Sequence, residues 1–226
     1  MRTEFINTLY EIAKKDKNVI LITGDLGFGV LDKFANDLPE QFINAGVAEQ
    51  DMAGLATGLA LEGKTVFTYS IANFPTLRCL EQIRNDVCYH NANVKIVSVG
   101  GGYSYGPLGM SHHATEDLSI MRALPNMTIV APGDTIETGY ATEAIYKLNG
   151  PCYLRLGRNG EGAIHSDNID FQVKPERFNL SPKLDDIIKN LDYLQLEKKI
   201  KVRKEDYEKF LELTKGDSIK IKKGLN

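Results

Sequence analysis

The sequence lacks a cysteine framework, a strong net charge and a long apolar run. Its three cysteines (Cys79, Cys88 and Cys152) are too few and too scattered for a disulfide framework, and their spacing fits no zinc motif. We therefore expect free thiols in a reducing cytoplasm. The formal net charge of -3 gives no electrostatic reason to expect nucleic acid or an anionic membrane as a partner. No apolar run approaches the roughly 20 residues that span a bilayer, and the N-terminus does not resemble a signal peptide.

The composition is that of a globular protein with one medium domain and an appendage. The 226 residues are 42% hydrophobic and 25% charged, which allows a sizeable buried core. After about residue 172 the chain becomes rich in Lys, Glu, Asp and Leu, with Pro175 and Pro182 at the boundary. We predict a domain over 1–172 and a charged helical appendage over 173–226, which contains no chemistry that we can identify.

The first 160 residues alternate between strand-like and helix-like patterns. Short apolar or β-branched runs predict strands at 19–23, 41–45, 64–70, 94–99, 127–131 and 152–156. Helical spacing or helix-start residues predict helices at 5–13, 48–61, 74–89, 116–124 and 134–148. This rhythm indicates an α/β fold, with a doubly wound, mainly parallel sheet covered by helices on both faces.

The loops at the carboxyl ends of the predicted strands are the best candidates for a site. Ligands of doubly wound sheets bind at that edge, and the loops 24–29, 45–50, 70–74 and 100–113 all lie there. The last of these loops is rich in glycine and contains two adjacent histidines, His112 and His113.

Several segments resemble the pyrimidine-binding domain of the transketolase family, in the family's order. They are 44–52, which contains Ala48-Glu49-Gln50, then 74–85, 109–117, 121–127 and 153–158. The likeness covers roughly residues 3–165. It implies a thiamine-diphosphate enzyme subunit that transfers a two-carbon ketol unit between sugars.

The resemblance identifies Glu49 as the acid that activates the cofactor. In the family such a carboxyl group hydrogen-bonds the aminopyrimidine, which then removes the proton from the thiazolium C2 carbon. Glu49 begins an Ala- and Gly-rich helix that allows close approach of a ligand. On position alone, Glu49 would only complement the helix dipole, an effect of about 0.3–1 kcal/mol. The further cofactor-binding residues that the resemblance implies are Phe74, on which the aminopyrimidine stacks, Ile71 in place of a second aromatic, Asp25, Leu26, Gln50 and Arg78.

The resemblance also implies substrate contacts. His112 matches the histidine that faces the substrate carbonyl, and His113 is the second candidate for this catalytic role. Arg158 matches the arginine that grips a substrate phosphate. Leu108 stands where transketolases carry an acid that binds a substrate hydroxyl.

Two further phosphate contacts of the family are replaced, a serine by Gly29 and a histidine by Gly100. We therefore expect that the sugar substrate is not a standard pentose phosphate.

The magnesium motif of thiamine enzymes is missing from the chain. Gly24-Asp25 is followed by Leu26 rather than glycine, and the sequence contains no Asn-Asn pair. We expect no metal ligands in this chain and a partner subunit that binds the diphosphate through Mg²⁺. The resemblance then implies an α2β2 heterotetramer, with its sites at subunit interfaces.

Three other functions remain open at this stage. One is the acyl-transferring subunit of a 2-oxoacid dehydrogenase, although Ser111-His112-His113 and the segment 121–125 look more like transketolase. Another is a condensing enzyme similar to deoxyxylulose-phosphate synthase, which shares Ala48-Glu49-Gln50. The third is a non-catalytic regulatory subunit, which would have no need of Glu49.

Overall fold

Six parallel strands form one sheet in this computed structural model, which describes residues 1–158, 161–166, 169, 171 and 173. The strand order is β2-β1-β3-β4-β6-β5, and every hydrogen-bonded pair of strands is parallel. The strands are β1 (Val19–Thr23), β2 (Phe42–Asn44), β3 (Thr65–Ile71), β4 (Val94–Val99), β5 (Thr128–Val130) and β6 (Cys152–Leu156). The predicted appendage at 173–226 lies outside the described residues except for Val173.

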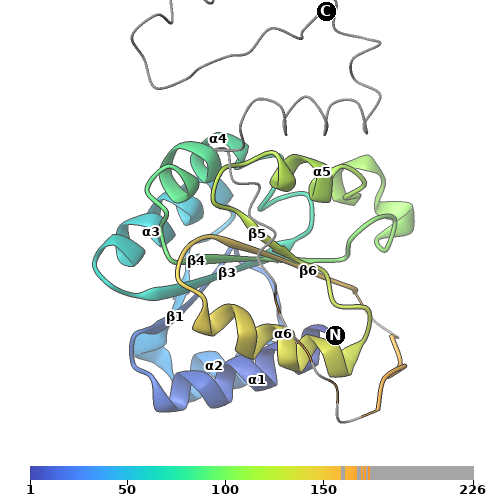
Figure 1. The fold of residues 1–226 in the computed structure, drawn as a ribbon, viewed down its shortest axis with the longest axis horizontal. Helices are drawn as coiled ribbons and strands as arrows, with labels where there is room; N and C mark the ends of the chain where they lie inside the picture. Colours follow the sequence, from blue (N-terminus) through green and yellow to red (C-terminus); the bar gives the residue numbers. More distant parts are fainter. Residues whose placement is uncertain (159–160, 167–168, 170, 172, 174–226) are drawn as a thin grey trace, which may run out of the picture. The chain divides into compact units, whose positions relative to one another are not determined.

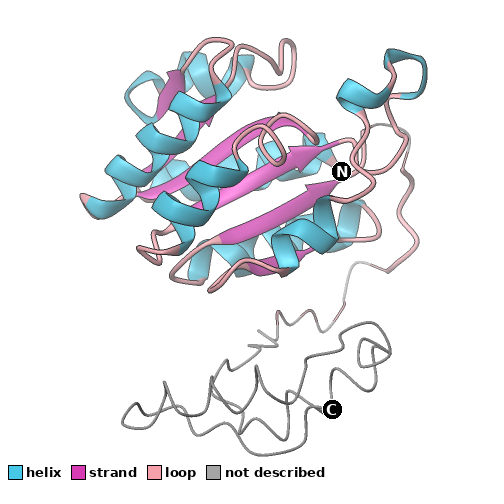
Figure 2. Ribbon diagram, turned by 90° about the horizontal axis from the view of Figure 1, so that it is seen from above, coloured by secondary structure: helices cyan, strands magenta, loops and turns pink. Residues whose placement is uncertain are grey.

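Helices cover both faces of the sheet (Figure 1). The helices α1 (Arg2–Lys15), α2 (Asp32–Asp37) and α6 (Thr135–Lys147) lie on one face. The opposite face is covered by α3 (Glu49–Leu61), α4 (Leu80–Gln82) with the π-helix Ile83–Cys88, and α5 (Asp117–Arg122). Each layer buries its own apolar cluster against the sheet, and Figure 2 shows the strands side by side among these helices. The predicted doubly wound fold is confirmed.

The strand order creates a crevice between β1 and β3. The chain passes from β1 to β2 on one side and then returns to β3 on the other side of β1. The loops that leave β1 and β3 therefore diverge at the carboxyl edge, which is where doubly wound sheets bind ligands. Thr23 and Tyr69 are paired across this point, so the loops after them begin at the same level of the sheet.

The segment predicted as a helix over 74–89 is helical only in its second half. Turns occupy residues 72–79, and α4 begins at Leu80. Side chains bond to the backbone in this segment, because Thr76 Oγ1 donates to the Ala72 carbonyl over 2.8 Å and Cys79 Sγ donates to the Phe74 carbonyl over 3.3 Å. Such local bonds compete with the helical ladder. The prediction of a continuous helix is therefore wrong, and the turns displace Phe74 and Arg78 from a regular helix face.

Asp134 caps α6, which begins where the predicted helix 134–148 begins. Its Oδ1 accepts a 2.8 Å bond from the Glu137 N–H, and its Oδ2 accepts bonds from the backbone N–H groups of Ile164 (2.7 Å) and His165 (2.8 Å). Asp134, Glu137 and His165 lie close enough together to hold a metal ion. Because both Asp134 oxygens already accept backbone donors, we assign this cluster to helix capping.

Among the described residues, none of the helices combines the length and the apolar character that crossing a bilayer would require.

Candidate active site

Glu49 is the buried acid of the crevice. It is the first residue of α3, which follows β2, and only 2% of it is exposed. Gly24, directly after β1, lies beside this acid, because a Cβ atom at Gly24 would be in van der Waals contact with Glu49 Cγ at 3.4 Å. The positive end of the α3 dipole lies at the same point. The sheet and the helix therefore hold one carboxyl group at the place where the strand order reverses.

Three further side chains form a continuous series of contacts from Glu49. Arg78 Nη1 donates a 2.8 Å hydrogen bond to Glu49 Oε2, and the Arg78 guanidinium lies 4.6 Å above the centre of the Phe74 ring. The Phe74 ring meets the His112 ring edge-on, with 5.0 Å between their centres. The structure thus brings together four residues that the sequence predicted for the site: Glu49, Phe74, Arg78 and His112.

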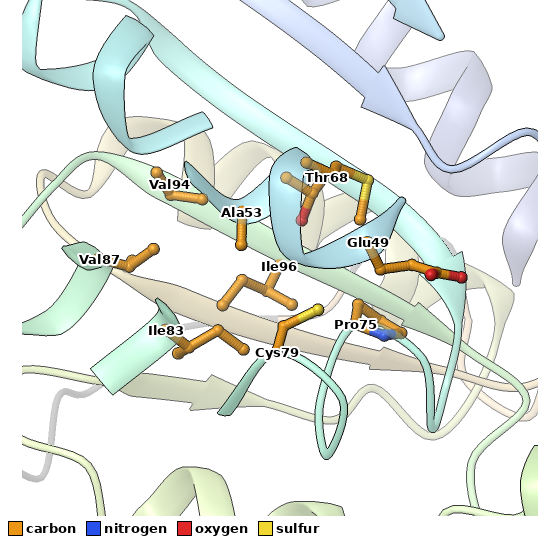
Figure 3. Close-up of a pocket in the computed structure, with 10 residues that line it drawn as sticks. Glu49, Ala53, Thr68, Pro75, Cys79, Ile83, Val87, Val94 and Ile96 are labelled. Carbon is orange, nitrogen blue, oxygen red and sulfur yellow. The ribbon is translucent and has the colours of Figure 1, made fainter. Parts of the chain in front are cut away.

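A narrow apolar cavity of about 10 Å³ lies behind Glu49 (Figure 3). Its walls include Cys79, Ile83 and Ile96, and the Glu49 carboxyl group lies at one end beside Pro75. Burial and then the charge of Glu49 raise the pKa of the Cys79 thiol to about 12, although the charge of Arg78 opposes them. The thiol therefore stays protonated and acts as part of an apolar wall.

The turn after β1 is held by Asn44 at the end of β2. Asp25 adopts a positive φ of 57°, its N–H donates a 3.0 Å bond to Asn44 Oδ1, and Asn44 Nδ2 donates a 2.9 Å bond to Asp25 Oδ1. The Leu26 carbonyl accepts a 2.9 Å bond from Thr23 Oγ1. These bonds give the turn a fixed shape beside Gly24, which is where the sequence predicted cofactor contacts.

Two other predicted cofactor residues lie at the margin of the crevice. Ile71 is the last residue of β3 and is partly exposed. Gln50 is exposed, and its Nε2 lies 3.5 Å from Gln82 Oε1 on the outer surface. Gln50 therefore contacts the neighbouring helix in this structure rather than the Glu49 cluster.

The two predicted histidines have different surroundings. His112 ends the 3₁₀ turn Met110–His112, and its Nδ1 lies 2.9 Å from Ser111 Oγ. His113 Nε2 lies 2.9 Å from the Gly106 carbonyl, within the same loop. The Phe74 loop is tied to this loop by Asn73, whose Nδ2 donates a 2.9 Å bond to the Ser111 carbonyl. His112 is thus the histidine that reaches the Glu49 cluster.

Arg158 follows β6 at the edge of the crevice. Its guanidinium lies 4.6 Å above the ring of Tyr105, and its Nη1 lies 3.5 Å from the Ser104 carbonyl. A Cβ atom at Gly100 would overlap the Tyr105 ring. Tyr105 therefore fills the space that a side chain at position 100 would occupy. Leu108 ends the 3₁₀ turn that follows Tyr105, and its apolar side chain is 52% exposed.

The charge of Arg2 acts on Tyr105, which the sequence did not predict. Burial raises the pKa of Tyr105, while the charges of Arg158 and then Arg2 lower it. Arg2 Nε is buried and has no hydrogen-bond partner in the part of the chain that the structure describes. Only the order of the elements could have indicated this position of Arg2, because the helix that precedes β1 begins at the carboxyl edge of the sheet.

This site defines a class of protein: a doubly wound α/β domain with a buried acid, an aromatic ring and a histidine around the switch point of its sheet. Comparison with known proteins then identifies the family. The chain belongs to the family described as transketolase, pyrimidine binding domain, whose sequence profile matches residues 1–160.

The relatives include proteins named as parts of divided transketolases. An apulose-4-phosphate transketolase subunit of Phocaeicola vulgatus is 40% identical over 172 residues, which are 76% of this chain and 55% of that protein. A putative transketolase C-terminal section of Methanocaldococcus jannaschii is 43% identical over 168 residues, 74% of this chain and 53% of that protein. A solved structure described as a split gene transketolase, inactive beta4 tetramer, matches with a TM-score of 0.68 and 36% identity, over 76% of this chain and 55% of that one. The chain thus spans about half the length of these relatives.

Proposed function

We propose that this chain is the pyrimidine-binding subunit of a thiamine-diphosphate-dependent transketolase that transfers a two-carbon ketol unit between sugars. One observation carries the proposal: Glu49 is buried at the switch point of the sheet and is linked through Arg78 and Phe74 to His112. A non-catalytic subunit would have no need to keep a carboxyl group in this position, since burying a charge costs free energy.

The residues present fit the pyrimidine half of the cofactor. Glu49 would hold the aminopyrimidine by a hydrogen bond, and the Phe74 ring would stack on it, with Ile71 beside it. Asp25 and Leu26 would reach the thiazolium side of the cofactor. The missing side chain at Gly24 leaves room close to Glu49. When bound, thiamine diphosphate supplies the nucleophilic carbon that a two-carbon transfer needs.

The chain's own residues would then divide the remaining work. Glu49 shares a proton with the aminopyrimidine, and the apolar wall behind it strengthens that hydrogen bond by excluding water. His112 faces the reacting carbonyl and moves protons there, because an imidazole ring can both donate and accept a proton. His113 has a smaller role, since its ring nitrogen lies against a carbonyl of its own loop.

The diphosphate and Mg²⁺ would be bound by a second polypeptide. The sequence has no Gly-Asp-Gly motif and no Asn-Asn pair, which are the elements that hold the metal in thiamine enzymes. Relatives named as a transketolase subunit or as a C-terminal section support a divided enzyme. We propose an α2β2 heterotetramer whose two sites lie between unlike subunits.

The substrate would be an anionic sugar other than a standard pentose phosphate. Arg158 lies over the ring of Tyr105, and the positive charge of Arg2 also acts on this phenol, a combination that suits a phosphate or a similar anion. Leu108 offers no hydrogen bond to a sugar hydroxyl, and Gly29 and Gly100 offer none to a phosphate. A relative named for apulose 4-phosphate supports a phosphorylated sugar as the anionic substrate.

The proposal is tested by recombining the chain with the polypeptide that carries the Gly-Asp-Gly motif. Calorimetry should detect tight magnesium-dependent binding of thiamine diphosphate to the mixture and little binding to this chain alone. Turnover of ketose donors by the mixture should fall by about 10²–10⁴-fold in Glu49→Gln. The control is Glu62→Gln, an exposed acid at the other end of α3, which should leave turnover unchanged. Tight binding to the chain alone, or full activity of Glu49→Gln, would overturn the proposal.

A further inference from the structure

The loop that carries the two histidines is closed at a narrow neck. Gly102 and Ala114 form an isolated antiparallel bridge: the Gly102 N–H donates to the Ala114 carbonyl over 2.7 Å, and the Ala114 N–H donates to the Gly102 carbonyl over 3.0 Å. His112 and His113 directly precede Ala114 in the chain. Whatever fixes this neck therefore fixes the position of His112.

Arg155, a residue of β6, contacts the neck from the side of the sheet. Its Nη2 donates a 3.2 Å bond to the Ala114 carbonyl, which thus accepts from Arg155 and from Gly102. Its guanidinium also packs against the backbone of Gly101, where a Cβ atom would overlap it. Arg155 contacts both strands of the neck, and it belongs to the rigid central sheet.

Asp117 fixes the guanidinium of Arg155. Asp117 is 2% exposed, and its Oδ2 lies 2.9 Å from Arg155 Nε in a close ion pair. The same oxygen accepts a 2.6 Å bond from the Tyr153 hydroxyl. Burial, and then the charge of Asp117, raise the pKa of Tyr153 well above its usual value, so this hydroxyl keeps its proton and remains a donor. A buried carboxylate with these partners cannot move without leaving charges unpaired.

We infer that Asp117 and Arg155 are positioning residues, which clamp the neck of the histidine loop to the sheet and hold His112 against Phe74. Neither residue reaches the Glu49 cluster through a direct contact among the described residues. The inference rests on the proposed function, because the proposed catalytic role of His112 is what gives the clamp a purpose. The clamp itself can be measured without any enzyme activity.

Hydrogen exchange on the isolated full-length chain tests the clamp. Asp117→Asn keeps the shape of the side chain but removes its charge from the ion pair. Arg155→Lys keeps the positive charge but removes the fixed fork of donors. Amide exchange over 103–113 should rise about tenfold or more in both variants, while exchange in α1 and α6 stays unchanged. The matched controls are Glu116→Gln and Arg84→Lys, which make the same chemical changes at exposed positions. Unchanged exchange over 103–113 would overturn the inference.

A milder variant covers the case in which Asp117→Asn does not fold. Tyr153→Phe removes the hydroxyl that donates the 2.6 Å bond to Asp117 and that also interacts with Ser98, and it should raise exchange over 103–113 in the same direction by a smaller factor. A rise of equal size across the whole chain would mean general loosening and would also contradict the clamp.

The recombined holoenzyme tests the link to His112. In Arg155→Lys, kcat should fall about tenfold or more while the affinity for thiamine diphosphate stays within about twofold, because the reacting group is misplaced and the cofactor contacts are kept. An unchanged kcat alongside increased exchange would overturn the positioning role. A wild-type mixture without activity would instead contradict the proposed function, and the exchange result would still decide whether the clamp exists.

Discussion

Arg78 and Glu49 are joined by a 2.8 Å hydrogen bond between an exposed guanidinium and a buried carboxyl group. The side chain of Arg78 is 47% exposed, whereas that of Glu49 is 2% exposed. Arg78 therefore covers Glu49 in the chain alone and occupies the oxygen Oε2, one of the two that a bound aminopyrimidine could use. Under the proposed function, Arg78 either turns aside or shares this oxygen when the cofactor binds.

Removal of Arg78 should destabilise the chain, because the buried carboxyl group then loses its charged partner. Arg78→Gln should lower the free energy of unfolding by about 1–2 kcal/mol, a value that allows for the exposure of the guanidinium. In a Glu49→Gln background the same substitution should cost less than about 0.5 kcal/mol. Urea denaturation of the four proteins in this double-mutant cycle measures the coupling, and equal costs in both backgrounds would show that the pair contributes nothing.

The two histidines should differ in their effect on turnover. His112→Gln should lower kcat of the recombined enzyme by about 10²–10³-fold, because this ring contacts Phe74 at the proposed reaction centre. His113→Gln should lower it by less than about tenfold, since a glutamine amide can also bond to the Gly106 carbonyl. Steady-state kinetics of both variants decides the assignment, and the reverse order of effects would transfer the catalytic role to His113.

Arg158 should determine affinity for the anionic group of the sugar rather than the rate of the chemical step. Arg158→Gln should raise KM for an anionic substrate by about 10–100-fold with a small change in kcat, which corresponds to the loss of a charge-assisted contact. Arg2→Gln should act in the same direction. The control is an uncharged analogue of the same sugar, for which neither variant should change KM; an equal effect on both substrates would exclude an anion-binding role.

The cap formed by Asp134 should make stability fall in acid. Backbone N–H donors, first His165 and then Glu137, hold the pKa of Asp134 well below its usual range, although burial opposes them. Because the pKa is lower in the folded chain than the value of about 3.9 in the unfolded chain, the stabilisation is present at neutral pH. This stabilisation is lost progressively as the pH falls from about 5 towards the pKa of Asp134 in the folded chain.

Asp134→Asn should therefore be less stable than wild type at pH 7, and the difference should shrink as the pH falls towards 3. Thermal unfolding at a series of pH values measures this difference, with the exposed acid Asp51 as the site of a control substitution to Asn. A difference that stays constant with pH would contradict the charged cap.

Local patterns were sufficient to predict the sheet and the position of Glu49. The continuous apolar run 19–23 coincides with β1, and Glu49 begins α3 as its place before an Ala- and Gly-rich stretch predicts. Each of these features depends on neighbouring residues, and so a sequence pattern can report it. The turns at 72–79 escaped the prediction, because backbone bonds between residues three apart, such as Thr76 N–H to the Asn73 carbonyl, form there instead of a continuous helical ladder.

Contacts between residues far apart in the sequence could not be predicted in this way. The charge of Arg2 acts on Tyr105 only because α1 begins at the carboxyl edge of the sheet, and Tyr105 fills the space beside Gly100 only once its loop has folded back. The ion pair of Asp117 with Arg155 likewise joins α5 to β6. In each case the three-dimensional arrangement of the elements, rather than any local pattern, creates the contact.

The rate at which the C2 proton of bound thiamine diphosphate exchanges with deuterium tests the role of Glu49 most directly. In the recombined enzyme, Glu49→Gln should slow this exchange by about 10²–10⁴-fold relative to wild type, with little change in cofactor affinity. Exchange at the wild-type rate in Glu49→Gln, with the cofactor bound, would contradict the assignment of Glu49 as the activating acid.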